Sequence, residues 1–396
     1  MKHIGLYIHI PFCKHKCYYC DFISFEKKEN EIERYVQALK KEIILVKKEN
    51  KILEDTIINT IYIGGGTPSY INEKYIEEIL NLLKSKFNFS KEIEITIEVN
   101  PGTVSKEKFE LYKKCGINRI SMGLQSCDEK VLKTIARIHN YETFLNCYEM
   151  ARNAGFKNIN VDLMLGIPNQ TIESLKDSLE KVIKLSPEHI SIYSLILEEN
   201  TKMYDMVLNG RLKMLDENLE RDMYWNSKDI LEKAGYKQYE ISNFAKDGLE
   251  SKHNLNCWNQ CEYVGFGVAA HSYFNQVRFS NVDDLESYIK NMNEVYNQKY
   301  EKDTKNSEID SKRNVLINEK QDEEMQMKEF MLLGLRKIDG IKISDFKQKF
   351  SENPIYYFRK ELEKLTNQKL IEIDENEIHL TKMGIDFANI AWSEFI

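Results

Sequence analysis

The amino-acid sequence predicts an α/β protein: a partial barrel of six βα units, followed by a small α+β domain like a winged helix. Six short β-rich runs alternate with helical stretches through the first half of the chain, as successive βα units require. Polar and glycine-rich motifs fall at the carboxyl ends of these runs. Residues 325–396 show a different pattern, in which helices precede two alternating strands.

The βα units can be followed in order along the chain. Strands are predicted over residues 5–10, 60–64, 94–100, 119–126, 158–165 and 189–196. Helical periodicity occupies the stretches between them, over residues 31–48, 73–86, 106–115, 129–137, 141–154 and 172–185. Runs such as IYIGG and INVDLML are almost continuously apolar, which is typical of parallel strands buried on both faces. Right-handed connections between such units produce a parallel sheet.

Periodicity alone does not separate a doubly wound sheet from a partial barrel, but the positions of the polar motifs do. Three cysteines follow the first strand and GGGTP follows the second, while Glu98, Gln125 and Asp162 belong to the next three. A doubly wound sheet concentrates its ligand contacts at one switch point. A parallel barrel instead gathers them around one rim. Contributions from five strands therefore favour the barrel.

The second half of the chain divides into shorter segments. Residues 201–235 are helical, 236–244 resemble a strand, and 263–279 resemble a glycine-rich loop and strand. Residues 301–324 are polar and lack periodicity, which indicates a linker or an exposed insertion. The predicted division is a barrel over 1–235, a barrel extension over 236–300, the linker over 301–324 and the winged-helix-like domain over 325–396.

The composition is that of an ordinary globular protein. The net charge of −7 and the isoelectric point near 5.8 argue against nucleic-acid binding, which needs a dense basic face. The amino-terminal MKHIGLYIHIPFC resembles neither a secretory signal nor a transit peptide. No apolar run approaches the length of a membrane span. We therefore expect a cytoplasmic protein.

Cys13, Cys17 and Cys20 are the strongest chemical signal. They are the only tight cluster among eight cysteines, and clustered cysteines in a reducing compartment indicate a metal. A cubane iron–sulfur cluster normally takes four thiolates, so three on one loop leave one iron open to another ligand. A zinc knuckle and unrelated thiols are the alternatives; the knuckle needs a fourth ligand nearby, and His15 is too tightly placed to supply it.

With the surrounding GLYIHIPFC and the following DF, this spacing resembles the radical S-adenosylmethionine (SAM) superfamily. That superfamily places the motif after the first barrel strand, with an aromatic residue before the third cysteine, a position that Tyr19 fills. The resemblance implies a [4Fe–4S] cluster that binds SAM and cleaves it reductively. The GGGTP segment at residues 64–68 matches the superfamily's loop that receives the amino group of SAM, although a glycine-rich turn can also be purely structural.

Four further strings, EVNPGT, GLQS, ARIH and NVDLMLGIP, resemble the oxygen-independent coproporphyrinogen oxidase branch of this superfamily. That branch uses matching positions to hold the ribose, carboxylate and adenine of SAM. Arginine suits a carboxylate, and acidic residues suit vicinal hydroxyls. Whether each position contacts the cluster-bound SAM or a second molecule stays open, and no catalytic residue is assigned. The implied SAM contacts are Tyr7, Tyr19, Gly65, Gly66, Thr67, Glu98, Gln125, Arg137 and Asp162.

The segment HNLNCW at residues 253–258 is the third signal. It resembles the H-N-x-x-Y-W motif of the HemW family of haem chaperones, and this resemblance spans nearly the whole chain. Neutral imidazole is a common axial haem ligand, so His253 is a haem candidate and His271 a second one, against structural roles for both. Cys257 replaces the tyrosine of the motif; it is interpreted as a buried thiol, with a soft iron ligand as the alternative.

Phe22 distinguishes two of the functions that these resemblances imply. The oxidases carry a further cysteine two residues after the third, where this chain has Phe22. The resemblance therefore implies a haem-binding and haem-delivering radical SAM protein, with haem as cargo. The alternatives are oxidative decarboxylation of coproporphyrinogen III in porphyrin biosynthesis and a radical SAM enzyme acting on another substrate. The implied partners are haem, haem-accepting proteins and an electron donor such as flavodoxin or ferredoxin, with a homodimer and peripheral contact with membrane proteins left open.

Overall fold

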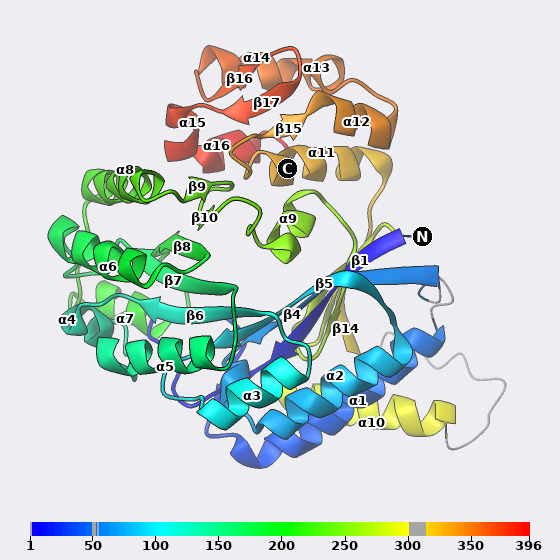
Figure 1. Ribbon diagram of the computed structural model, residues 1–396. Coiled ribbons are helices and arrows are strands. Elements are labelled where there is room, and N and C mark those ends of the chain that lie inside the picture. The colour runs from blue at the N-terminus through cyan, green and yellow to red at the C-terminus, as the bar shows by residue number, and fades with distance from the viewer. Residues whose placement is uncertain (1, 50–52, 54, 301–313) are drawn as a thin grey trace.

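The computed structural model describes residues 2–49, 53, 55–300 and 314–396 (Figure 1). Its centre is a twelve-stranded sheet in the order β14-β13-β12-β11-β1-β4-β5-β6-β7-β8-β10-β9. Six consecutive members of this sheet run parallel and are adjacent in the order in which they occur in the sequence. They are β1 (Lys2–Ile10), β4 (Thr56–Gly65), β5 (Asn88–Val99), β6 (Arg119–Gln125), β7 (Ile159–Leu165) and β8 (His189–Ser194).

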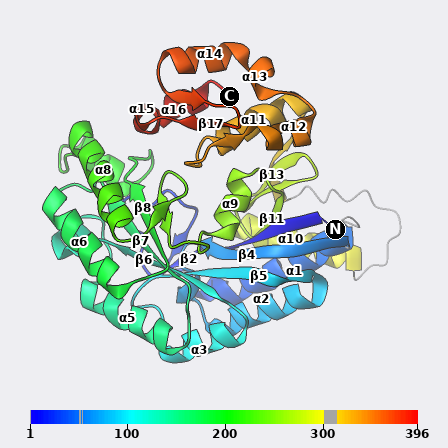
Figure 2. The same ribbon diagram turned by 45° about the horizontal axis from the view of Figure 1, so that its top comes forward.

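This strand order has no reversal, so the predicted partial barrel is confirmed and the doubly wound alternative is wrong. Helices connect the strands and cover the outer face of the sheet (Figures 1 and 2). They are α1 (Ile32–Glu49), α2 (Glu73–Lys86), α3 (Lys106–Lys114), α4 (Glu129–Thr134), α5 (Tyr141–Asn153) and α6 (Ile172–Leu185).

Local sequence sets where these helices begin. Asn72, Ser105, Asp128, Asn140 and Thr171 each accept a hydrogen bond from a backbone N–H of the first turn, a cap that contributes about 1 kcal/mol to helix stability. None of the helices in the described part of the chain is both long and apolar enough to span a lipid bilayer.

The barrel is extended at both edges. After α7 (Lys202–Leu208) and α8 (Glu217–Lys233), β9 (Lys237–Gln238) and β10 (Asn243–Ala245) continue the sheet beyond β8. The single strand predicted over 236–244 is thus two short strands, because Glu240 and Ile241 turn aside to pair with Lys337 and Arg336. At the other edge, α9 (Lys252–Trp258) precedes β11 (Tyr263–Phe266), β12 (His271–Phe274), β13 (Val277–Asn281) and α10 (Leu285–Tyr300).

The predicted linker differs in part from the structure. Residues 301–313 lie outside the described residues, but β14 (Val315–Lys320) is hydrogen-bonded along β13 at the edge of the sheet. The strand begins with a short apolar run, VLI, which stands at the end of a long polar stretch. Residues 323–324, also placed in the linker, begin the first helix of the carboxyl-terminal domain, α11 (Glu323–Gly334).

The carboxyl-terminal domain has its own hydrophobic core and a three-stranded antiparallel sheet, as a winged-helix-like unit requires. Arg336 joins it to the barrel, because its guanidinium lies 4.5 Å from the ring centres of both Trp258 on α9 and Trp392. Its remaining elements are β15 (Ile341–Lys342), α12 (Ile343–Phe350), α13 (Pro354–Tyr357), α14 (Arg359–Asn367), β16 (Ile371–Ile373), β17 (Glu377–Leu380), α15 (Lys382–Asp386) and α16 (Ala388–Ser393).

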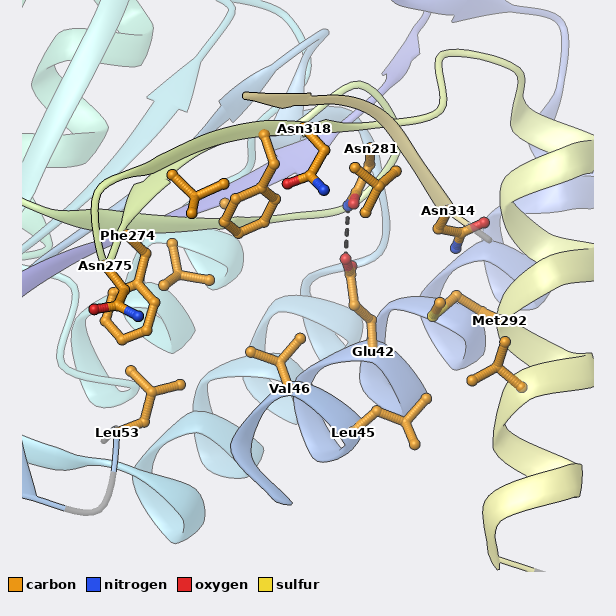
Figure 3. A pocket seen from close by; sticks show the side chains of 16 residues that line it. Glu42, Leu45, Val46, Leu53, Phe274, Asn275, Asn281, Met292, Asn314 and Asn318 are labelled. Carbon is orange, nitrogen blue, oxygen red and sulfur yellow. Dashed lines mark hydrogen bonds between the residues drawn. The ribbon is translucent and has the colours of Figure 1, made fainter. Parts of the chain in front are cut away.

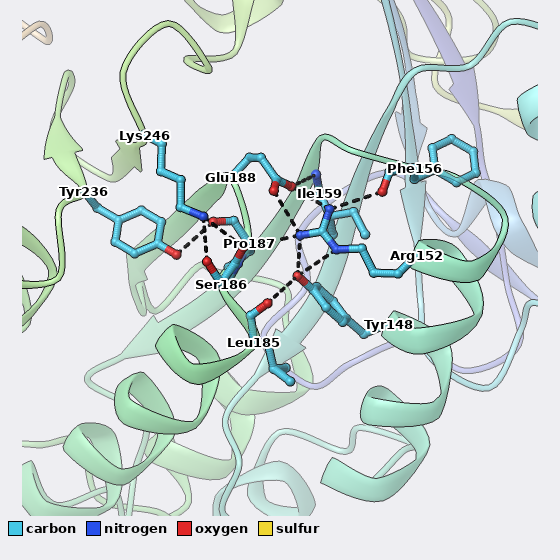
Figure 4. A network of polar contacts seen from close by, with 10 residues as sticks. All are labelled: Tyr148, Arg152, Phe156, Ile159, Leu185, Ser186, Pro187, Glu188, Tyr236 and Lys246. Carbon is cyan, nitrogen blue, oxygen red and sulfur yellow. Dashed lines mark hydrogen bonds and ion pairs between the residues drawn. The ribbon is translucent and has the colours of Figure 1, made fainter.

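A polar network fastens the amino-terminal ends of β7 and β8 (Figure 4). Arg152 donates to both carboxylate oxygens of Glu188, at 2.8 and 3.1 Å, and Glu188 also accepts from the backbone N–H of Ile159. Tyr148 donates to the Leu185 carbonyl and accepts from Arg152. Because this network lies at the end of the strands opposite the predicted functional rim, its role is to hold α5 and α6 against the sheet.

A cavity of about 330 Å³ lies between α1, α10 and strands β11 to β14 (Figure 3). Glu42 projects into it and accepts hydrogen bonds from Asn281, Tyr288 and the backbone N–H of Gly267. Burial raises the pKa of the Glu42 carboxyl to about 7, with the three hydrogen bonds opposing that rise. These contacts satisfy the side chain, so its role in the fold is structural.

Because the pKa of the Glu42 carboxyl is raised in the folded protein, we expect the stability of the fold to depend on pH. In the unfolded chain it loses its proton near pH 4.3, whereas in the folded protein it keeps the proton to about pH 7. The folded state therefore binds more protons in that window, and the free energy of unfolding falls as the pH rises through it, by about 1–3 kcal/mol. We expect Glu42→Gln to remove this contribution in urea titrations at pH 5 and pH 8, while Glu33→Gln, on the exposed face of the same helix, retains it. Equal pH slopes in wild type and Glu42→Gln would contradict the assignment.

Candidate functional site

A second cavity, of about 400 Å³, lies at the carboxyl ends of the parallel strands and contains most of the predicted site residues. This volume is in the range of small-molecule sites, about 300–1,000 Å³. Strand register explains the convergence: Glu98 on β5 is level with Ser121 on β6, and Asp162 on β7 is level with Gly123 on β6. Eleven predicted residues line the cavity: Cys13, Cys17, Cys20, Tyr19, Gly65, Gly66, Thr67, Glu98, Gln125, Arg137 and Asp162.

The cysteine loop is held by a two-stranded parallel ladder. Here β2 (Phe12–Cys13) pairs with β3 (Phe25–Glu26), and Phe25 donates its N–H to the Pro11 carbonyl at 2.7 Å. Glu26 faces back across the loop, where it accepts from the backbone N–H of Lys16 and lies 3.0 Å from His15 Nδ1. The intervening residues therefore form a closed loop over the barrel rim.

The three thiols fit a cluster ligand set. All three line the same cavity, and the Cys13 thiol accepts a 3.4 Å contact from Thr67 Oγ1. Burial and the neighbouring Cys17 raise the pKa of the Cys20 thiol to about 11, and burial likewise raises the pKa of Cys13. Thiolates in such surroundings need a bound cation to offset their burial and mutual repulsion, a requirement that the iron of a cluster would meet.

The glycines permit close packing between the cysteine loop and β4. Gly65 has φ +113°, and a Cβ added there would lie 2.6 Å from the His9 ring. A Cβ on Gly66 would lie 3.0 Å from Cys13 Sγ. Backbone hydrogen bonds from Gly66 to Ile10 and from Thr67 to Phe12, both 2.9 Å, complete the contact. The GGGTP segment is therefore needed to form the cluster loop, whatever it contributes to a ligand.

Two half-buried carboxylates form one wall of the cavity. Glu98 accepts from the Tyr62 hydroxyl at 2.9 Å and from the Gly65 N–H at 3.1 Å. Burial, together with the negative charge of Asp162, raises the pKa of Glu98 to about 7. Asp162 accepts from Ser121 and Asn160, and burial raises its pKa as well. A ligand that brings hydroxyl donors or positive charge would stabilise the charged form of both carboxyl groups.

Arg137 reaches the cavity from the turn after α4. Its Nη2 donates to Asn100 Oδ1 at 2.6 Å and to the Gly123 carbonyl at 2.5 Å, and its Nη1 lies 3.5 Å from Cys17 Sγ. Two buried polar atoms here, Arg137 Nε and Gln125 Oε1, have no hydrogen-bond partner in the described part of the chain. Unpaired buried polar atoms are costly, so they mark where a polar ligand fits. The residues present therefore fit SAM.

The structure places three candidates away from this cavity. Tyr7 lies behind Tyr62, with ring centres 6.4 Å apart, and is hydrogen-bonded to His9 at 2.9 Å. His253 is also behind Tyr62, stacked on it at 5.2 Å and hydrogen-bonded through Nδ1 to Thr60. His271 begins the exposed end of β12 and does not line the cavity.

Sequence reasoning missed several lining residues. Asn100 bridges Arg137 and Thr67, and Tyr62 binds Glu98. Both occupy carboxyl-terminal parts of strands already identified. Since functional residues of a parallel barrel lie at those strand ends, every polar residue there could have been taken as a candidate. The segment 193–196, which ends the sixth predicted strand, also lines the cavity and could have been found in the same way.

Known proteins match this chain along its length. The radical SAM superfamily matches residues 7–182, and the HemN C-terminal domain matches residues 321–387. The haem chaperone HemW of Bacillus subtilis is 35% identical over 396 residues, which covers 98% of each chain. This chain belongs to the HemW family. The HemW family protein of Escherichia coli is 38% identical over 272 residues, covering 68% of this chain and 69% of its own.

A solved structure agrees with the fold. Coproporphyrinogen III oxidase HemN of Escherichia coli superimposes with a TM-score of 0.83 over 100% of this chain and 90% of that one, at 22% identity. The predicted radical SAM barrel and its HemW family membership are therefore confirmed.

Proposed function

We propose that this protein binds haem and delivers it to haem-accepting proteins, and that a [4Fe–4S] cluster on Cys13, Cys17 and Cys20 binds SAM beside it. Similarity to haem chaperones along the full chain supports the haem function. The cavity, with three thiols at one side and unpaired polar atoms at another, supports the cluster and SAM.

One observation favours haem delivery over oxidative decarboxylation. Phe22, at the position of the oxidases' further cysteine, lines the cavity and is 62% exposed. An exposed aromatic ring offers an apolar surface to a macrocycle and no thiol chemistry. This chain thus lacks the further cysteine that the oxidase branch carries.

The candidate residues have the following parts in this proposal. The cluster supplies reductive cleavage of SAM when both are bound. Gly65, Gly66 and Thr67 shape the wall beside the cluster, and Arg137 and Gln125 orient polar groups of SAM with their unpaired atoms. Glu98 and Asp162 accept from hydroxyls. Tyr19 lines the cavity beside the cluster loop, Tyr7 supports Tyr62 from behind, and His253 stays the haem candidate that its motif indicates.

The remaining features of the proposal are a cytoplasmic location and electron supply by a flavodoxin or ferredoxin. A homodimer and peripheral contact with membrane proteins complete it.

A pair of assays tests the function on the full-length protein after anaerobic cluster reconstitution. Titration with haem should produce a saturable Soret band at one haem per chain, alongside the cluster absorbance. Incubation with coproporphyrinogen III, SAM and a reductant should produce no protoporphyrinogen IX. Absence of saturable haem binding, or robust decarboxylation, would overturn the proposal.

A further inference from the structure

Polar side chains continue inward from the SAM cavity, toward the amino ends of β7 and β8. Asn160 on β7 is level with His189 on β8, and Asp162 is level with Ser191. Alternate residues of a strand point to the same face of a sheet, so Asn160 and Asp162 lie on one face of β7. Asp162 is half-buried and lines the cavity, whereas Asn160 and His189 are 2% and 0% exposed. These two buried side chains lie behind the cavity wall, and no part of the site described above uses them.

The Asn160 amide uses its full hydrogen-bonding capacity. Its Nδ2 donates to Asp162 Oδ1 at 2.7 Å and to Ser121 Oγ at 2.8 Å. Its Oδ1 accepts from His189 Nδ1 at 2.7 Å and from Ser191 Oγ at 3.1 Å. A side-chain amide has two N–H donors and two acceptor lone pairs, so all four are occupied. A reversed amide would place its carbonyl oxygen against the Asp162 carboxylate, and two acceptors repel each other.

The proton position on His189 decides which way this amide points. Burial, together with the positive charge of Arg119, holds the pKa of His189 well below its ordinary value, so the neutral ring carries one proton. Its Nε2 lies 2.8 Å from the Tyr239 hydroxyl, and that hydroxyl oxygen accepts from the backbone N–H of Ser251 at 3.3 Å. A backbone N–H can only donate, which leaves the Tyr239 hydrogen to point at Nε2. The single ring proton is therefore on Nδ1 and faces Asn160.

Tyr239 is itself fixed by segments outside the parallel strands. Its backbone N–H donates to the Asn243 carbonyl, and its carbonyl accepts from Ile338 in the carboxyl-terminal domain, both at 3.1 Å. Ser251 is the amino-terminal cap of α9, where its side chain accepts from the Asn254 N–H. Four hydrogen bonds thus run in one direction, from the cap of α9 to the wall of the SAM cavity.

We propose that Asn160, His189 and Tyr239 are positioning residues for SAM, because their hydrogen-bond chain orients the Asp162 carboxylate as an acceptor for SAM hydroxyls. Burial raises the pKa of Asp162, and the hydrogen bond from Asn160 opposes that rise. The chain therefore favours the ionised carboxylate and fixes its orientation before SAM binds. Supporting hydrogen bonds of this kind hold the groups that contact a ligand in their binding geometry. The inference rests on the proposed function, since it specifies how the cavity prepares Asp162 for SAM.

The test compares two substitutions of His189 in reconstituted full-length protein, with SAM affinity as the measured quantity. His189→Leu keeps most of the bulk of the ring and removes the donor to Asn160. His189→Asn is smaller but offers an amide N–H near the position of Nδ1. We expect His189→Leu to weaken SAM binding roughly three- to tenfold, as for one lost hydrogen bond, and His189→Asn to restore most of the affinity. A residue that served packing alone would give the opposite order.

A milder variant and a double-mutant cycle complete the test. Tyr239→Phe removes only the hydroxyl that sets the proton position on His189, and should weaken SAM binding roughly twofold or more. Tyr236→Phe is the matched control: it loses a buried hydroxyl that donates to the Pro187 carbonyl at 2.8 Å, outside the chain, and should bind SAM like wild type. In an Asp162→Ala background, His189→Leu and Tyr239→Phe should have no further effect, because both act through that carboxylate.

The possible results separate this inference from the proposed function. Wild-type protein that binds no SAM defeats the proposed function, and the inference with it. Normal binding by wild type, with unchanged affinity in His189→Leu and Tyr239→Phe, would overturn the positioning role alone. An equal loss in the Asp162→Ala background would also overturn it, because His189 would then act through the fold. If neither His189 variant holds the cluster, Tyr239→Phe against Tyr236→Phe decides: equal SAM affinities would reject the chain.

Discussion

Each of the single variants Cys13→Ala, Cys17→Ala and Cys20→Ala is expected to lose the iron–sulfur cluster. Wild-type protein should hold about four iron and four sulfide per chain after anaerobic reconstitution. The loop offers three thiols, so removal of one leaves an iron without its thiolate ligand. The same variants should lose SAM binding, because the open iron that chelates SAM is lost with the cluster.

Iron and sulfide analysis with the absorbance spectrum of the cluster measures this effect. Cys261→Ala is the matched control, since Cys261 is a half-buried free thiol outside the cavity, and it should reconstitute fully. A full cubane in any of the three loop variants would remove the basis of the metal assignment.

The second large effect is expected from the two carboxylates of the cavity wall, Glu98 and Asp162. We expect Glu98→Ala and Asp162→Ala to weaken SAM binding by roughly 10- to 150-fold, which corresponds to about 1.5–3 kcal/mol for a lost charged hydrogen-bond partner. Both carboxylates are half-buried at the cavity wall and accept from neutral groups, so a ligand hydroxyl can bind them without breaking an ion pair.

Equilibrium binding of SAM to the reconstituted protein measures the loss. Glu92→Ala, on the exposed part of β5, provides a control on the same strand and should bind SAM normally. Cluster content and the thermal midpoint should stay near wild type in all three variants. Unchanged SAM affinity in both Glu98→Ala and Asp162→Ala would show that these residues do not contact SAM and have a structural role in the barrel.

The barrel could be predicted because its signals are local. Continuous apolar runs identify the strands, and strand ends that share one rim bring their polar residues together. Contacts between distant segments could not be predicted in this way. Arg137 and Asn100 are 37 positions apart, and nothing in the sequence around either residue indicates that they form a hydrogen bond. The β14 strand was missed because its apolar run, VLI, is only three residues long and follows a long polar stretch.

The His253 candidate illustrates a further limit. A motif gives the residue type but not its depth in the fold, and depth here depends on how α9 enters the barrel beside β4. His15, which was rejected as a zinc ligand on spacing alone, is a second example. Its pairing with Glu26 arises only when β3 returns alongside β2.

The guanidinium of Arg336 between two indole rings has a consequence for how this protein can be dissected. The carboxyl-terminal domain packs on α9 through α11, and its Arg336 lies against Trp258. Trp258 belongs to the same short helix as His253, which in turn backs the cavity wall through Tyr62. We expect a truncated barrel that lacks the carboxyl-terminal domain to lose this support for α9, His253 and Tyr62. The cavity of such a truncated protein is therefore not equivalent to the cavity of the whole chain.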